Sequence, residues 1–344
     1  MPETLTILIA SYLEPEYVER IRSINPRVRV LYEPSLIGKP RFIADHGAPV
    51  KRLAEEEAHW KSLLAEADIL FDFDPTHRGD LLEVAPKLKW VQATSAGIGQ
   101  FVANFGLSDR GVVFTTASGV HATALAEYCL MSMLMFAKMA LHIAEEKQKK
   151  HWARFCAKEL RGSTLAVVGL GRVGTEVARL GRCTGMRVIA TKRTMEGVDP
   201  ELVPVDALFP SERLEELLTQ ADYVVLSVPH TPETDQMMGE RQIGLMKPGS
   251  VLINIARGAV IDEQVLIRAL KSGHLRGASL DVFATEPLPS GSPLWEMPNV
   301  IICPHSASTA DTENEKITEI FLDNLDRFIN GKPMRNVLNT VRLY

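Results

Sequence analysis

Cysteine is scarce in this sequence, and its four residues (Cys129, Cys156, Cys183 and Cys303) lie far apart. No C-x-x-C pair occurs, which argues against a structural zinc site and fits a reducing compartment. The chain also lacks a long basic run, and its net charge is −5, so we expect no nucleic-acid partner. What remains is a chain of 344 residues with 46% apolar and 24% charged residues. That composition is typical of a soluble globular protein, and the length predicts about two domains.

The N-terminal segment shows no basic stretch followed by an apolar one, so we expect no secretory signal. One apolar segment, residues 122–140, is nearly long enough to span a membrane. It contains Glu127 and Lys138, and charge in the middle of a membrane is costly. We therefore predict a buried helix here, no association with a membrane, and a cytoplasmic protein.

Short apolar runs alternate with amphipathic segments, as in a parallel sheet with crossover helices. A first series of predicted strands covers residues 5–10, 28–32, 69–71, 90–94 and 112–115. A second, more regular series covers residues 165–168, 187–190, 224–228, 251–255, 278–282 and 300–302. The chain ends with a predicted amphipathic helix over 309–330. The fold class is therefore α/β, with two doubly wound parallel sheets.

The clearest motif is a G-x-G-x-x-G turn formed by Gly169, Gly171 and Gly174. An apolar strand leads into it and an amphipathic helix leads out, which is the context of a dinucleotide-binding turn. Gly169 permits the tight turn, Gly171 lets the backbone approach a pyrophosphate, and Gly174 lets helix and strand pack closely. The free N–H groups of the helix N-terminus then face the anion.

The end of the second strand bears on the choice of cofactor. An acidic residue about 20 positions beyond the turn would bind the ribose 2′-hydroxyl of NAD. Lys192 and Arg193 occupy this region instead, and both can donate hydrogen bonds to a 2′-phosphate. The sequence therefore favours NADP(H) over NAD(H).

Three further motifs follow predicted strands, where an open α/β sheet places its ligands. They contain Arg257, Glu286 and His305. Reduction of a carbonyl by a nicotinamide requires a proton, and histidine can supply it near neutral pH. A carboxylate beside it, from Glu286, would stabilise the imidazolium. The Arg257 guanidinium could bind a substrate carboxylate and polarise the carbonyl.

Here the chain resembles the D-isomer-specific 2-hydroxyacid dehydrogenases, including the glyoxylate/hydroxypyruvate reductases. The resemblance rests on the glycine turn, on the segments 246–249 and 256–258, on Asp281-Val282-Phe283 with Glu286-Pro287, and on Pro304-His305. It covers essentially the whole chain. It implies that Arg257, Glu286 and His305 are the catalytic residues. The implied reaction is reduction of a small 2-keto acid such as glyoxylate, hydroxypyruvate or pyruvate.

The resemblance implies further contacts and a domain arrangement. Backbone N–H groups of Ala96, Gly97 and Ile98 would bind the substrate carboxylate, together with Arg257 and His305. The remaining cofactor contacts would come from Arg172, Val173, Pro229, Thr234, Ile255, Ala256, Asp281 and Ser306. A Rossmann nucleotide-binding domain (residues 119–308) would be inserted into a flavodoxin-like substrate domain (1–118 and 309–344). No metal is expected, and the helix over 121–139 would form a homodimer interface.

Some positions depart from the family pattern, and two other functions remain open. Gly99 stands where many members have aspartate, His121 where many have asparagine, and Lys192 where an acid is usual. We expect His121 to pack rather than to catalyse. One alternative is a non-catalytic, NAD(H)-sensing corepressor-like protein, but such a protein has little need of an acid–base set. The other is a formate dehydrogenase-like enzyme, whose family pairs the histidine with glutamine rather than glutamate.

Overall fold

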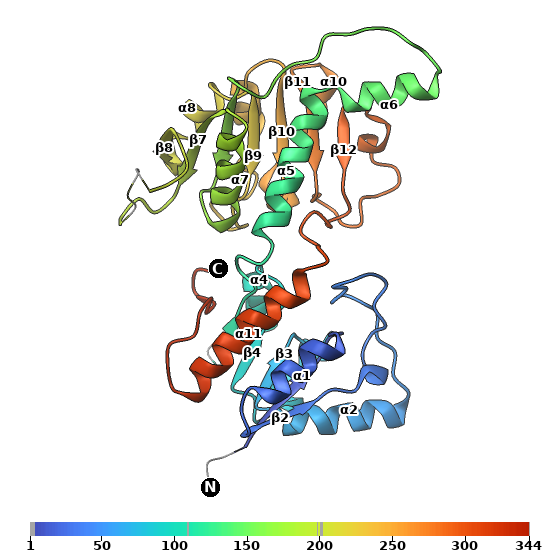
Figure 1. Cartoon of the computed structure of the whole chain (residues 1–344), viewed down its shortest axis with the longest axis vertical. Helices are drawn as coiled ribbons and strands as arrows, with labels where there is room; N and C mark the ends of the chain where they lie inside the picture. The colour runs from blue at the N-terminus through green and yellow to red at the C-terminus, as the bar shows by residue number, and fades with distance from the viewer. Residues whose placement is uncertain (1–3, 109, 198, 200–201, 344) are drawn as a thin grey trace. The chain divides into compact units, whose positions relative to one another are not determined.

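A computed structural model describes residues 4–108, 110–197, 199 and 202–343. The chain divides into two compact units, Met1–His121 with Thr309–Tyr344, and Ala122–Ser308 (Figure 1). The sequence placed these boundaries near Ser118 and Thr309. Each unit has its own fully parallel sheet, which confirms the predicted α/β class with two parallel-sheet domains.

The first unit contains a five-stranded sheet in the order β2-β1-β3-β4-β5, the flavodoxin-like order. Its strands are β1 (Leu5–Ile9), β2 (Val28–Leu31), β3 (Ile69–Phe71), β4 (Trp90–Gln92) and β5 (Val113–Thr115). Helices α1 (Pro15–Ser23) and α11 (Glu313–Ile329) pack on one face of the sheet. The other face is covered by α2 (Ala54–Glu66), α3 (Leu81–Val84) and α4 (Gly99–Asn104). With both faces covered, most strand residues are apolar, and every residue of β1 and β3 is buried.

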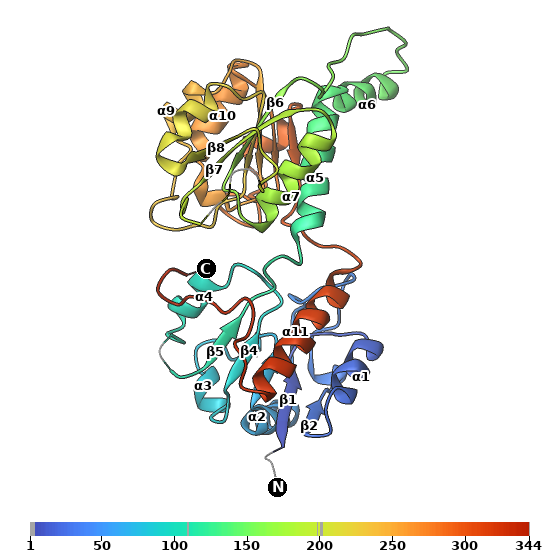
Figure 2. The same cartoon turned by 60° about the vertical axis from the view of Figure 1, so that its left-hand side comes forward.

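The C-terminal helix α11 belongs to this first unit, although it lies about 200 residues beyond β5 in the sequence (Figure 2). Trp90 of β4 is fully buried, and its ring stacks on Phe321 at 5.0 Å and on Phe328 at 5.6 Å between ring centroids. His121 Nε2 lies 3.2 Å from the Glu313 carboxylate. His121 thus makes a polar contact with α11, and its expected packing role stays a prediction.

The second unit contains a seven-stranded sheet in the order β12-β11-β10-β9-β6-β7-β8. Its strands are β6 (Thr164–Val168), β7 (Arg187–Lys192), β8 (Ala207–Pro210), β9 (Tyr223–Leu226), β10 (Ser250–Asn254), β11 (Leu275–Leu280) and β12 (Val300–Ile302). Helices α5 (Ala122–Ala137) and α7 (Arg172–Cys183) pack on one face. The helices α8 (Leu214–Leu218), α9 (Glu240–Leu245) and α10 (Glu263–Lys271) pack on the other. The order reverses at β6, so the carboxyl end of β6 marks the ligand-binding crevice.

Two elements differ from the sequence-based expectation. The edge strand β8 was not predicted, because a four-residue segment ending in proline is a weak strand signal that only an edge tolerates. The predicted helix over 122–140 ends at Ala137, since Met139 adopts a left-handed conformation (φ 57°) before α6 (Ala140–Gln148) begins. Among the described residues, no single helix is long and apolar enough to cross a membrane. Helices α5 and α6 meet that test only as a pair, with a bend of 61° between them.

Candidate active site

The glycine turn lies between β6 and α7, and each of its glycines meets a different constraint. Gly169 has φ 98°, and a Cβ there would lie 2.7 Å from Val228. A Cβ on Gly174 would lie 2.2 Å from the carbonyl oxygen of Gly169, so helix and strand approach too closely for a side chain. A Cβ on Gly171 would meet no atom within 4 Å. The turn is thus tightly packed on its inner side and open at Gly171, which fits a cofactor pyrophosphate.

Lys192 is the last residue of β7 and lies beside this turn. Its Nζ donates a hydrogen bond of 2.7 Å to the carbonyl of Leu170, in the middle of the turn. Arg193 follows it directly, and its positive charge helps lower the pKa of Glu233, after hydrogen bonds from Thr231 and the backbone. A cationic pair therefore occupies the place where an acidic residue would bind the ribose of NAD.

The proposed catalytic residues follow three neighbouring strands. Arg257 comes after β10, Glu286 lies in the segment after β11, and His305 comes after β12. Because these strands are parallel and adjacent in the sheet, their carboxyl ends bring the three loops together. The structure thus gathers residues that are up to 48 positions apart in the sequence.

His305 and Glu286 form a direct pair. The Nδ1 of His305 lies 2.8 Å from Oε2 of Glu286, whose Oε1 accepts a hydrogen bond of 3.0 Å from the backbone N–H of Phe283. The side chain of His305 is 46% exposed, and that of Glu286 is 36% exposed. Because Nδ1 faces the carboxylate, Nε2 is the ring nitrogen left to face a substrate.

Asp281 holds the loop that presents His305. Its Oδ1 accepts hydrogen bonds from the backbone N–H groups of Ser306 and Ala307, at 2.8 and 2.9 Å. The N–H of His305 donates to the Asp281 carbonyl, and His305 has a left-handed backbone (φ 52°). Burial, followed by a hydrogen bond to Asp281, raises the pKa of the Cys303 thiol to about 11. Asp281 therefore organises the loop over 303–307.

Arg257 is largely buried, and its Nη1 donates to the carbonyl of Ala256 at 2.7 Å. Burial lowers the pKa of Arg257, while the nearby charges of Glu286 and Asp281 oppose that effect. The next residue must be glycine, because a Cβ on Gly258 would lie 1.9 Å from the carbonyl oxygen of Phe283. This close approach joins the Arg257 segment to the segment that leads to Glu286.

The other predicted cofactor residues lie at the same edge of this sheet. Thr234 follows β9, and its hydroxyl donates to the carbonyl of Pro229 at 2.7 Å. Ile255 and Ala256 are buried directly after β10, where Asn254 accepts a hydrogen bond from the N–H of Ala256. Arg172 and Val173 form the first turn of α7. No group of three or more metal-binding side chains occurs in the described ranges.

The predicted substrate residues lie in the first unit, after β4. Ala96 and Gly97 are exposed, whereas Ile98 is buried and precedes α4. A Cβ on Gly99 would lie 1.9 Å from the carbonyl oxygen of Leu343. Glycine at this position thus accommodates the C-terminal segment. Sequence reasoning missed this contact, because no local pattern links residues so far apart.

Comparison with known proteins finds relatives among the 2-hydroxyacid dehydrogenases. The model of the D-isomer specific 2-hydroxyacid dehydrogenase NAD binding domain matches residues 130–307. A glyoxylate reductase from Korarchaeum cryptofilum is 31% identical over 330 residues, covering 88% of this chain and 96% of that protein.

Two solved structures of the family have a similar fold. One, from Aeromonas salmonicida, is 28% identical with a TM-score of 0.80 and covers 98% of this chain and 100% of its own. The other, from Xanthobacter autotrophicus in complex with NADPH and MES, is 27% identical with a TM-score of 0.79 and covers 99% and 100%. The matches confirm the resemblance seen in the motifs: the chain belongs to the D-isomer specific 2-hydroxyacid dehydrogenase family and is an NAD(P)-dependent dehydrogenase.

Proposed function

We propose that this protein reduces a small 2-keto acid of the glyoxylate, hydroxypyruvate or pyruvate type to the D-2-hydroxy acid, preferring NADPH. The observation that carries the proposal is the 2.8 Å contact between His305 and Glu286, with Arg257 near enough for Glu286 to affect its pKa. The glyoxylate reductase of Korarchaeum cryptofilum supports the substrate class.

The chain's own residues would move the proton and hold the substrate. Bound NADPH would supply the hydride. His305 donates a proton from Nε2 to the carbonyl oxygen, while Glu286 at Nδ1 stabilises the charged imidazole. Arg257 holds the substrate carboxylate with its fork of donors and polarises the carbonyl. In the first unit, the backbone N–H groups of Ala96, Gly97 and Ile98 are the further substrate contacts that the family resemblance implies.

The cofactor would be held mainly by the glycine turn. Gly169, Gly171, Arg172, Val173 and Gly174 would face the pyrophosphate, with Pro229 and Thr234 beside the adenosine and Ile255, Ala256 and Ser306 nearer the nicotinamide. Asp281 would bond the nicotinamide carboxamide, in addition to the two backbone N–H groups that it already holds.

Lys192 and Arg193 support the preference for NADPH, as does the NADPH bound in the Xanthobacter autotrophicus neighbour. Michaelis constants for NADPH and NADH, measured with the wild type and with Lys192→Asp, test this preference. A hydrogen bond to a charged group contributes about 1.5–3 kcal/mol. We therefore expect the preference for NADPH over NADH to fall at least about tenfold in Lys192→Asp. A wild type that favours NADH would contradict the proposal.

We also propose that this protein forms a homodimer in the cytoplasm through the helix region around 121–139. Several large apolar side chains on α5, α6 and the segment after them are exposed: Met131, Leu134, Ile143, Trp152 and Phe155. Trp152 alone is 96% exposed. Such a surface is typical of an interface between subunits. Its test is the mass in solution, with Leu134→Glu expected to yield monomers.

The main experiment is a panel of 2-keto acids assayed with both reduced cofactors. Reduction of at least one of them, lost in His305→Gln, would support the proposed function. Cofactor binding without any reduction would instead favour the corepressor-like alternative. The glutamate at position 286 argues against the formate dehydrogenase-like alternative.

A further inference from the structure

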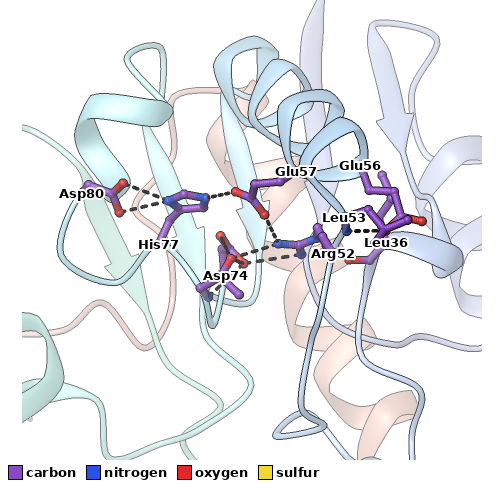
Figure 3. Close-up of polar contacts among 9 residues, drawn as sticks. Leu36, Arg52, Leu53, Glu56, Glu57, Asp74, His77 and Asp80 are labelled. Carbon is purple, nitrogen blue, oxygen red and sulfur yellow. Dashed lines mark hydrogen bonds and ion pairs between the residues drawn. The ribbon is translucent and has the colours of Figure 1, made fainter.

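A second histidine–carboxylate cluster lies in the first unit, outside the residues assigned above (Figure 3). Its ionisable members are Arg52, Glu57, Asp74, His77 and Asp80. Arg52 precedes α2 and Glu57 lies in its first turn, whereas the other three lie in the loop that follows β3. The cluster therefore ties the loop over residues 72–80 to the start of α2.

Both ring nitrogens of His77 face carboxylates. Its Nε2 lies 2.6 Å from Glu57 Oε1, and its Nδ1 lies 2.9 Å from Asp80 Oδ2. An ionised carboxylate only accepts hydrogen bonds, and neutral imidazole has a single N–H. Both contacts are therefore hydrogen bonds only when the ring is protonated, and loss of the proton sets a lone pair against a carboxylate.

The surroundings of His77 favour the charged ring. Burial lowers the pKa of His77, but hydrogen bonds to Asp80 and Glu57 and the charge of Asp74 outweigh burial and raise it. The side chain is only 8% exposed. Of the three carboxylates around the ring, Glu57 and Asp74 pair with Arg52, and Lys61 acts on Asp80 from α2. Protonation of His77 thus reduces an excess of negative charge.

Arg52 anchors the other side of the loop. Its side chain is 2% exposed, and its Nη1 donates to the hydroxyl of Thr76 at 2.9 Å. Its Nε donates to the carbonyl of Leu36, and the guanidinium lies 4.2 Å from the ring centre of Trp60. These contacts fix Arg52 in place. We therefore assign the change of protonation within this cluster to His77.

The anchored loop packs against the helix that begins at the proposed substrate loop. Phe73 lies 4.6 Å from Phe101, between ring centroids, and Phe101 lies in the first turn of α4. The guanidinium of Arg78 lies 6.0 Å from the centre of the same Phe101 ring. The first backbone hydrogen bond of α4 runs from Val102 to the carbonyl of Ile98. Displacement of residues 72–80 would therefore shift α4 and the backbone over 96–98.

We propose that His77 is a positioning residue whose protonated ring fixes the loop over 72–80 and, through Phe73 and α4, the backbone that binds the substrate carboxylate. The affinity for the 2-keto acid is then linked to pH at His77, separately from proton transfer at His305. This inference rests on the proposed function of Ala96, Gly97 and Ile98.

The first test compares kinetic constants of the wild type and His77→Gln. Glutamine is polar and of similar size, but its single amide group cannot donate to both carboxylates and does not titrate. Because coupling between sites is typically about 5- to 150-fold, we expect KM for the 2-keto acid to rise at least about fivefold at pH 6.5. We expect kcat to stay within about twofold, because no reacting group has changed.

The pH dependence separates positioning from general loss of structure. In the wild type, KM should rise with pH once His77 loses its proton, above about 6.5. In His77→Gln, KM should lack this rise with pH, whereas changes of KM caused by other titrating groups should remain. Glu57→Gln removes one carboxylate that stabilises the charged ring, so the midpoint of the rise should move to lower pH. An unchanged midpoint in Glu57→Gln would overturn the proposal.

His59→Gln is the matched control. His59 lies on α2, and like His77 it pairs with a glutamate, since its Nε2 is 3.0 Å from Glu33. It is 51% exposed, and its ring nitrogens lie against Glu33 and Ser62 rather than against the loop over 72–80. We expect KM and its pH profile to match the wild type. An equal rise of KM in both histidine variants would show that no specific path through His77 exists.

A measurement that needs no turnover keeps this inference separate from the proposed function. Hydrogen exchange of the amides over 96–102, corrected for the intrinsic effect of pH, should show protection that falls with pH in the wild type. In His77→Gln, protection should be low at every pH. Should the wild type reduce no 2-keto acid, the proposed function fails, and this measurement alone decides the role of His77. Equal protection in both proteins would overturn that role.

Discussion

Two of the histidine–carboxylate pairs in this protein, one in each unit, differ in their surroundings. His305 binds Glu286 through one ring nitrogen and is 46% exposed, on a backbone with positive φ. His77 binds a carboxylate through each nitrogen and is 8% exposed. A ring with one nitrogen left over can exchange a proton with a substrate. A ring with both nitrogens occupied can only hold neighbouring segments in place.

The largest expected difference between the two histidines is in turnover. His305→Gln removes the proposed proton donor and should lower kcat by roughly 10²- to 10⁴-fold, the usual contribution of general acid catalysis. His77→Gln, assayed under the same conditions, serves as the control and should leave kcat nearly unchanged. Steady-state kinetics with saturating NADPH measure both. Near-native kcat in His305→Gln would remove this residue from the mechanism.

The arginine near His305 extends the comparison. Arg257→Lys keeps the charge but loses the fork of donors, so KM for the 2-keto acid should rise about 10- to 100-fold. The control is Arg268→Lys, since Arg268 is 59% exposed and pairs with Glu240 on the surface. We expect the control to behave as the wild type. Equal KM values in the two variants would show that Arg257 does not bind the substrate carboxylate.

Stability should depend on pH through His77. Because its pKa is raised on folding, the charged ring adds stability that is fully present below about pH 6.5 and is lost as the pH rises through the raised pKa. His77→Gln should lower the free energy of unfolding by about 1–3 kcal/mol at pH 6, and by less at pH 9. Urea unfolding at both pH values measures the difference. A deficit that grows with pH would contradict this assignment.

The smallest expected effect is that of His305 on stability. Its side chain is nearly half exposed, so His305→Gln should change the free energy of unfolding by less than about 0.5 kcal/mol. The same urea titrations provide the measurement, with His77→Gln as the contrasting variant. A loss as large as that of His77→Gln would erase the distinction between the two sites.

Much of this site could be predicted from local sequence. The glycine turn stands between an apolar strand and an amphipathic helix, and Arg257, Glu286 and His305 each lie in a motif that follows a strand. The strands were visible because a parallel sheet buried on both faces needs continuous apolar runs. Edge strand β8 was missed because it is short, half-buried and ends in proline.

The His77 cluster shows where sequence reasoning stops. Glu57 and His77 are 20 residues apart and follow no known spacing, and a lone histidine carries no sign of its partners. Only the packing of α2 beside the loop after β3 brings them to 2.6 Å.

The amino-acid sequence alone determined the fold class, the dinucleotide turn and the membership of the family, because these depend on periodicity and on motifs confined to short segments. Tertiary structure alone decided which nitrogen of His305 and of His77 faces a carboxylate, and why position 99 must be glycine. These are properties of contacts between segments far apart in the chain. Such contacts exist only once the sheets have set those segments side by side.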